Sequence, residues 1–142
     1  MDWLEEKIDG FRRDRLNCSQ IMMALSLELR DLENPELLKA MSGLGGGLHV
    51  RHVCGTLTGG CCLLASYDDS ERDMHTASLF LPGKEIIRSY VQWFEREFGS
   101  LLCEDLTGGD MTKMATVCPV LLKQSFEKCI ALLQESGINP EI

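Results

Sequence analysis

The sequence predicts an all-α protein, a compact bundle of five to six helices that forms a single domain over residues 1–142. Apolar residues recur at helical spacing in several segments, and no segment sustains the alternation of apolar and polar residues that marks a half-buried strand. The composition, with 44% hydrophobic and 25% charged residues, is that of a globular protein. A chain of 142 residues is also long enough to bury a core without a disulfide or a metal.

The N-terminal part of the chain predicts two helices. Residues 2–13 place apolar side chains near helical spacing and charged side chains at the other positions, which is the pattern of an amphipathic helix. Asn17 and Gln20 have the spacing of a capping box and precede an apolar run, so we expect a second helix that ends near Leu32. Cys18 then lies in the first turn of this second helix.

The middle of the chain predicts two further helices and an irregular segment. Residues 34–43 begin with Asn and Pro, which favour a helix start, and end with Gly. Residues 53–66 are almost entirely small or apolar, so we expect a buried central helix there. Residues 67–82 are polar and irregular. Residues 86–98 carry a clear apolar face, and Gly99 ends the helix that this face predicts.

Two more elements complete the predicted bundle. Ser100 is expected to cap a short helix that runs through Leu106. The Gly-Gly-Asp sequence at 108–110 breaks the chain, and Cys118–Pro119 then opens a last helix with apolar positions as far as Leu133. No repeat or low-complexity tract interrupts this pattern.

The charge balance bears on partners and location. With 14 Lys and Arg against 22 Asp and Glu, the chain has a net charge of −8 and repels phosphate backbones and anionic lipid surfaces. We therefore expect no nucleic-acid partner and no membrane insertion, and no run of apolar residues is long enough for a transmembrane helix. The N-terminus has no basic stretch followed by an apolar run, which predicts a cytoplasmic protein.

Several familiar catalytic motifs do not occur in the sequence. The Gly-rich stretch 43–47 is followed by Leu48, where a dinucleotide fingerprint needs its third Gly, and no Gly-Lys-Ser/Thr follows. The sequence also contains no Gly-x-Ser-x-Gly and no His-Glu-x-x-His. It therefore supports neither nucleotide binding nor hydrolysis.

Cysteine is the residue type that points to chemistry. The chain has seven cysteines, an odd number that excludes complete pairing within one chain. Four of them, Cys18, Cys54, Cys103 and Cys118, fall at predicted helix starts, where the partial positive charge of a helix N-terminus favours a thiolate. This placement is typical of reactive or metal-ligating sulfur. The alternative is that each cysteine is a small buried apolar side chain.

The other three cysteines, Cys61, Cys62 and Cys129, are assigned mainly to packing. Cys61 follows Cys54 by about 10 Å along a helix, which is too far for a disulfide within that helix, although Cys61 could lie behind the site as a relay. Cys129 is likewise too far from Cys118 along the last helix for a disulfide within that helix. The four cysteines at predicted helix starts form no Cys-x-x-Cys pair, so their spacing alone names no metal.

Two glycines and two histidines lie near Cys54. Gly55 and Gly59 are four residues apart and share a helical face that lets a second helix, or a flat ligand or cofactor, approach the backbone closely. His49 and His52 precede Cys54 and could ligate a metal or activate its thiol, or they could face solvent.

Taken in order, these features resemble a known family. They are Asn17-Cys18-Ser19-Gln20, the Gly-rich stretch, Cys54-Gly55-Thr56-Leu57-Thr58-Gly59, Phe98-Gly99-Ser100 leading to Cys103, and Cys118. Together they resemble the redox-active C-GCAxxG-C-C family, small proteins of about this length with four characteristic cysteines and a Cys-Gly-Ala-x-x-Gly motif. The resemblance spans almost the whole chain and implies a redox or metal role for Cys18, Cys54, Cys103 and Cys118. Thr56 departs from the motif, which has Ala at this position.

Three functions remain open on this basis. Two or four of these cysteines could converge and cycle between dithiol and disulfide with a redox partner protein. They could instead hold an iron–sulfur cluster or another thiophilic metal and transfer electrons. The chain could also be a non-catalytic helical adaptor. Either of the first two functions requires these cysteines to meet in one site. A homodimer is a further hypothesis, motivated by Trp3 and Trp93 as exposed aromatic side chains.

Overall fold

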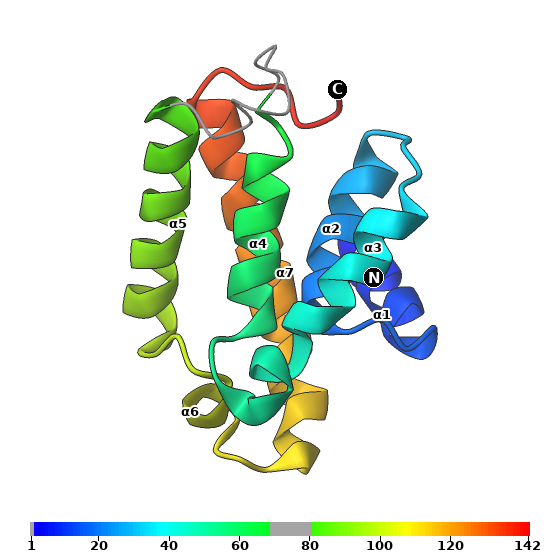
Figure 1. Ribbon diagram of the computed structural model, residues 1–142, viewed down its shortest axis with the longest axis vertical. Coiled ribbons are helices and arrows are strands. Elements are labelled where there is room, and N and C mark those ends of the chain that lie inside the picture. Colours follow the sequence, from blue (N-terminus) through cyan, green and yellow to red (C-terminus); the bar gives the residue numbers. More distant parts are fainter. Residues whose placement is uncertain (1, 69–80) are drawn as a thin grey trace.

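The computed structural model describes residues 2–68 and 81–142, which contain seven α-helices (Figure 1). The helices are α1 (Trp3–Arg13), α2 (Cys18–Leu29), α3 (Pro35–Met41), α4 (Gly55–Ala65), α5 (Leu81–Phe98), α6 (Cys103–Thr107) and α7 (Met111–Glu135). Two short turns, η1 (Ser42–Leu44) and η2 (Gly47–Arg51), connect α3 to α4. The described residues form no strand and only one isolated β-bridge. The all-α prediction is therefore confirmed, with seven helices instead of five to six.

Predicted capping residues set several helix boundaries. Asn17 accepts a hydrogen bond from the N–H of Gln20 at 3.1 Å, and the Gln20 side chain accepts from the N–H of Asn17 at 3.0 Å, which completes the capping box. Asn34 accepts from the N–H of Leu37 at 3.2 Å. Gly99 follows α5 with φ +82°, a conformation that favours glycine. These local signals act as the sequence predicted.

The centre of the bundle is α4. This helix contacts α2, α5 and α7, and Figure 1 shows it between α5 and α2 with α7 behind it. Its side chains Leu57, Leu63 and Leu64 are at most 4% exposed, because neighbouring helices cover α4 on several sides. From α5, the buried Tyr90 hydroxyl donates a hydrogen bond to the carbonyl oxygen of Thr56 at 2.9 Å. The predicted buried central helix is confirmed.

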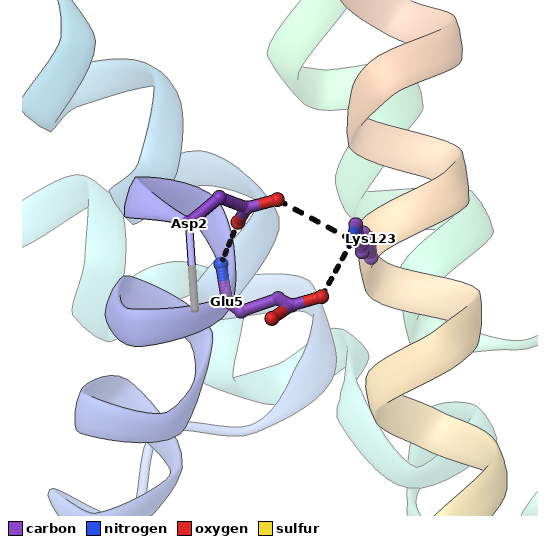
Figure 2. Close-up of polar contacts among 3 residues, drawn as sticks. All are labelled: Asp2, Glu5 and Lys123. Atoms are coloured by element: carbon purple, nitrogen blue, oxygen red, sulfur yellow. Dashed lines mark hydrogen bonds and ion pairs between the residues drawn. The ribbon is translucent and has the colours of Figure 1, made fainter.

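The start of α1 is tied to α7 by the polar contacts in Figure 2. Asp2 caps α1 by accepting a hydrogen bond from the N–H of Glu5 at 2.8 Å. Lys123 of α7 forms ion pairs with Glu5 at 2.6 Å and with Asp2 at 3.4 Å. Ion pairs this exposed contribute little to stability, because water screens the charges. Burial of Leu4 and Ile8 therefore provides most of the energy that holds α1 in place.

The last helix begins earlier than the sequence predicted. α7 starts at Met111 and not at Cys118–Pro119. Its start is set by Asp110, whose carboxylate accepts a hydrogen bond from the N–H of Thr112 at 2.8 Å. Pro119 consequently lies inside α7, where it has no N–H to donate to the preceding turn. Cys118 is therefore an interior helical residue.

The short helix α6 also differs from its prediction. It begins at Cys103, and Ser100 does not cap it directly. The Ser100 hydroxyl instead accepts from the N–H of Leu102 at 3.1 Å and donates to the Asp105 carboxylate at 2.8 Å. The irregular segment predicted at 67–82 lies almost wholly outside the described residues.

Two further findings concern the surface. None of the helices in the described ranges has the length and apolar character needed to span a bilayer. Trp3 is 42% exposed, but Trp93 is half-buried and packs against Phe98 with ring centroids 5.4 Å apart. Only one of the two tryptophans is thus an exposed aromatic side chain, and the homodimer stays a prediction.

Candidate functional site

One cavity brings together the four cysteines that the sequence analysis selected. Its volume is about 280 Å³, and Cys18, Cys54, Cys103 and Cys118 all lie in its wall. Each comes from a different element, because Cys18 opens α2, Cys54 precedes α4, Cys103 opens α6 and Cys118 lies in α7. These elements come together around the beginning of α4, in the lower half of Figure 1. Much of the remaining wall is apolar and includes Leu16, Ile21, Leu106, Met114, Leu121 and Leu122.

Side chains on both sides of Cys18 anchor the start of α2. The Asn17 amide donates a hydrogen bond to the carbonyl oxygen of Ser42 at 2.9 Å. The Ser19 hydroxyl donates to the carbonyl oxygen of Met41 at 2.7 Å. Both acceptors lie at the junction of α3 and η1. Cys18 is therefore held at a fixed place between two anchored residues, where it is half-buried.

Backbone pairing joins the segment that contains Cys54 to the segment that contains Cys103. The N–H of Cys103 donates to the carbonyl oxygen of His52 at 2.7 Å, and the N–H of Cys54 donates to the carbonyl oxygen of Leu101 at 2.8 Å. These bonds flank the single antiparallel β-bridge among the described residues. Both thiols are buried. Two short segments that are distant in sequence are thus joined at the cavity, with Cys54 next to one bridge residue and Cys103 next to the other.

A left-handed turn closes part of the cavity. Residues 46–49 have φ values between +59° and +63°, and Leu48 and His49 are among them. This conformation costs about 1 kcal/mol for a residue with a side chain. Gly47 cannot be replaced easily, because a Cβ atom there would meet the backbone of His52 and lie 2.9 Å from the Cβ of Cys103. The turn therefore packs directly against the residues that form the site.

The structure separates the two predicted histidines. His49 lies in the cavity wall, and its Nε2 is 2.8 Å from the carbonyl oxygen of Ser42. Since a carbonyl can only accept, this nitrogen carries a proton. His52 is exposed and is not part of the wall, although its backbone pairs with Cys103. Of the two imidazoles, only that of His49 faces the thiols.

The predicted glycine face of α4 lies against α2. A Cβ atom at Gly55 would meet the Sγ atom of Cys18 and would lie 3.1 Å from the Cα of Gly45. At Gly59 it would lie 2.7 Å from the Cα of Ser19. Gly55 is part of the cavity wall, whereas Gly59 is not. Gly55 thus leaves room for the Cys18 thiol, and Gly59 lets the two helix backbones approach each other.

Burial opposes ionisation of three of the four thiols, so the thiolates predicted from helix starts are not favoured. Burial raises the pKa of Cys54 from 9.0 to about 11, and negative charge on Cys18 adds to this rise. The backbone N–H groups in the first turn of α4 oppose the rise only in part. Burial, followed by the three neighbouring thiols, raises the pKa of Cys118 to about 12. Burial also raises the pKa of Cys103.

The other three cysteines lie outside the cavity wall. Cys129 is fully buried on α7, and burial, followed by the charge of Cys61, raises its pKa well above 9.0. Burial also raises the pKa of Cys61 to about 12, with a smaller contribution from Cys62. Cys62 packs against a separate cluster that contains Met23 and Met41. These surroundings match the packing role that the sequence suggested.

The thiols do not form a metal site in the arrangement seen here. Throughout the described ranges, no three His, Cys, Asp or Glu side chains are placed where they could hold a metal ion. A tetrathiolate site needs sulfur atoms about 2.3 Å from one ion. We therefore derive no step through a metal or an iron–sulfur cluster. All seven cysteines are free thiols.

Sequence analysis missed the cationic side chains near the thiols. Arg12, in the last turn of α1, lies in the cavity wall, and its charge partly offsets the rise in the pKa of Cys118. The charge of Arg51 likewise offsets part of the rise in the pKa of Cys103. No local pattern distinguishes these arginines from others on the surface. They become visible only once the fold brings α1 and η2 to the same cavity.

Comparison with known protein families identifies the family of the chain. A family model described as "Putative redox-active protein (C_GCAxxG_C_C)" matches residues 16–133. No curated protein and no solved structure matches the chain. The matched region contains all four cavity cysteines and the glycine face of α4. Because this match covers most of the sequence, the chain belongs to the C-GCAxxG-C-C family.

Proposed function

We propose that the cavity is a dithiol/disulfide redox site. In this site Cys18 attacks a substrate disulfide, and a second cavity thiol completes a disulfide within the protein. The proposal depends chiefly on one observation, that four thiols from four separate elements line one cavity of about 280 Å³. Thiol–disulfide exchange needs thiols that can reach one another, and a shared cavity meets that need. The description of the family as redox-active agrees with it.

Cys18 is suited to the attacking role by its position. It is the first residue of α2, between the anchored side chains of Asn17 and Ser19. Cys18 and Cys118 are half-buried, whereas Cys54 and Cys103 are buried, so a substrate reaches the first two more easily. Of these two, Cys118 is the weaker candidate for the attacking thiol, because burial raises its pKa to about 12. The charge of Cys18 also contributes to the raised pKa of each of the other three cavity cysteines. Cys18 is therefore accessible and adjacent to each thiol that could complete the reaction.

The proposed reaction has two exchange steps. The Cys18 thiolate attacks one sulfur of a substrate disulfide, a new S–S bond forms, and the other substrate sulfur leaves and takes up a proton. A second cavity thiol then loses its proton and attacks the Cys18 sulfur, so the mixed disulfide breaks and the second substrate thiol leaves. One substrate disulfide has become two thiols, and two protein thiols have lost two electrons and two protons to form a disulfide. Run in reverse, the same steps reduce the protein.

The experiment that tests this function measures which thiols a disulfide oxidises. The fully reduced protein is mixed with bis(2-hydroxyethyl) disulfide, the remaining thiols are alkylated at intervals, and the modified cysteines are mapped by mass spectrometry. We expect the loss of two thiols, both from the cavity set, and their recovery with dithiothreitol. Cys18→Ser should lower the initial rate at least about tenfold, because the other cavity thiols are largely protonated at neutral pH.

Cys62→Ser is the matched control, since Cys62 is also half-buried but lies outside the cavity wall. This variant should react like the unmodified protein. The proposed function is wrong if no disulfide, whether this one or the disulfides of a protein such as insulin, causes a reversible loss of cavity thiols. It is also wrong if oxidation maps to Cys61, Cys62 or Cys129, or if Cys18→Ser reacts as fast as the control.

A further inference from the structure

The charge around the cavity differs from the charge of the whole chain. The chain carries a net charge of −8, yet no Asp or Glu occurs among the described residues of the cavity wall. The one side chain with a permanent charge in that wall is the guanidinium of Arg12, and the imidazole of His49 lies in the same wall. Within the described part of the chain, the wall around the four thiols is therefore free of carboxylates.

A second arginine stands close to the same thiols. Arg51 belongs to η2, and its guanidinium donates a hydrogen bond to the carbonyl oxygen of Gly109 at 3.3 Å. The charge of Arg51 acts on Cys103, and the charge of Arg12 acts on Cys118, so the two cations reach the thiols from different elements. Positive charge is therefore present on more than one side of the site.

Neither arginine is neutralised by a carboxylate within the described residues. The three ion pairs found there join Lys7 to Glu28 and Lys123 to Asp2 and Glu5. Among the residues that the structure describes, Arg12 and Arg51 therefore have no carboxylate partner, like the other arginines there. Their guanidinium groups remain available for an anionic group that enters from solution.

We propose that the cavity binds a low-molecular-weight disulfide that carries carboxylate groups close to its sulfur atoms. This inference rests on the proposed function and adds the substrate class. The cavity thiols can exchange with the disulfide bond, and the guanidinium groups can bind the carboxylates. The substrate therefore needs both groups, a disulfide and carboxylates close to it. The volume of about 280 Å³ lies at the small end of the range for small-molecule sites.

The positive charge also assists the exchange reaction. A carboxylate on the disulfide is attracted to the Arg12 guanidinium at short range, which favours the bound complex with the thiols. In the first step Cys18 bonds to one substrate sulfur, and the departing sulfur carries the negative charge until it gains a proton. The Arg12 charge stabilises that departing thiolate inside the cavity. The atoms and electrons balance as in the reaction above, with the anionic disulfide as the oxidant.

The test compares three disulfides that share one reactive group and differ in charge. They are 3,3′-dithiodipropionate, which is anionic, bis(2-hydroxyethyl) disulfide, which is neutral, and cystamine, which is cationic. The rate of thiol loss with each is divided by its rate with free 2-mercaptoethanol, which removes differences in intrinsic reactivity. At low salt we expect the anionic disulfide to be favoured over the neutral one by about tenfold and the cationic one to be slowest. Salt at 0.5 M should reduce these differences.

Variants of two adjacent arginines locate the effect. Arg12→Gln should lower the ratio of anionic to neutral rates several-fold, because it removes the charge from the cavity wall. Arg13→Gln is the matched control, since Arg13 lies in the same turn of α1 but is exposed and outside the wall. The control should keep the ratio of the unmodified protein.

The outcomes separate the substrate class from the proposed function. If the three normalised rates are equal, or if cystamine is fastest, the thiol site stands and the anionic substrate is wrong. The same conclusion follows if Arg12→Gln and Arg13→Gln change the ratio equally. Reaction with the disulfides of insulin but with none of the small disulfides would assign the cavity to a protein partner. If no disulfide oxidises the cavity thiols, the proposed function itself fails.

Discussion

Replacing Gly59 by Ala tests whether α2 and α4 touch through their backbones. In an isolated helix this change stabilises the helical state by about 1 kcal/mol. In the protein, the new Cβ atom would lie 2.7 Å from the Cα of Ser19 and 2.7 Å from its carbonyl oxygen. Carbon atoms prefer separations of about 3.5–4.0 Å. The two helices would therefore have to move apart, and backbone atoms cannot yield as the end of a flexible side chain can.

The expected magnitude comes from two opposing contributions. Overpacking of a tight interior site costs about 1–3 kcal/mol, and a backbone contact this close belongs at the upper end of that range. With about 1 kcal/mol regained from helix propensity, Gly59→Ala should lose about 2 kcal/mol of unfolding free energy. Gly10→Ala is the matched control in α1, because a Cβ atom there would have no neighbour closer than Arg13 at 3.8 Å. It should gain about 1 kcal/mol.

Urea unfolding followed by circular dichroism, with all cysteines reduced, measures both variants. The difference between the two unfolding free energies isolates the packing cost, about 3 kcal/mol, because helix propensity contributes equally to each. If Gly59→Ala proves as stable as Gly10→Ala, α2 and α4 do not approach each other as closely as described. The position of Cys18 beside α4 would then be wrong as well.

Three further predictions concern the surroundings of the site. Burial raises the pKa of Cys54 from 9.0 to about 11, so its neutral thiol stabilises the folded state below pH 9 and this contribution is lost as the pH rises to 11. In urea titrations, the fall in unfolding free energy between pH 9 and pH 11 should therefore be smaller for Cys54→Ser than for the unmodified protein, by about 2 kcal/mol, and equal falls would contradict the burial of this thiol. Asn17→Ala removes the capping box and the hydrogen bond to Ser42, so urea unfolding should show a loss of about 2 kcal/mol of unfolding free energy. An unchanged urea midpoint would contradict the anchoring of α2. Tyr90→Phe removes the buried bond to Thr56 and should cost about 1 kcal/mol in thermal or urea unfolding, while a variant as stable as the unmodified protein would argue against that bond.

Local signals in the sequence were sufficient where one residue and its near neighbours decide the structure. The caps at Asn17 and Asn34 depend on hydrogen bonds to backbone groups three residues away, so the sequence contains all that they need. The same is true of Gly99, which can adopt the left-handed conformation at a helix end. These features could be predicted because no distant part of the chain takes part in them.

The start of α7 shows where local signals compete. Pro119 is acceptable at the first position of a helix, so the sequence favoured a start at Cys118. Asp110 offers a second start signal, and its carboxylate bonds to the N–H and hydroxyl of Thr112. The earlier start also brings Met114 into the cavity wall, and this packing extends the helix through the proline. Propensity at one residue is weaker than packing gained over two turns.

The cavity itself could be predicted only in part. The resemblance and the expected helix starts selected Cys18, Cys54, Cys103 and Cys118, but the link between Cys54 and Cys103 depends on a β-bridge too short to leave any alternation in the sequence. The charge state of these four thiols could not be predicted from the sequence either. Desolvation depends on what covers a thiol, and α7 contributes the walls that bury them.

Mutual repulsion among the thiols bears on how such a site would work. The pKa of Cys118 is raised by burial and then by negative charge on Cys18, Cys54 and Cys103 in turn, so one thiolate in the cavity disfavours a second. In the proposed reaction, a disulfide that joins Cys18 to one neighbour removes two of these negative charges. The two thiols that remain then ionise more easily, since they have lost the repelling charge of Cys18, which raises the pKa of each of the other three. Repulsion among the four cysteines therefore favours exchange steps that follow one another, with one cavity thiolate present in each step. The single negative charge of that thiolate can be balanced by Arg12 and Arg51.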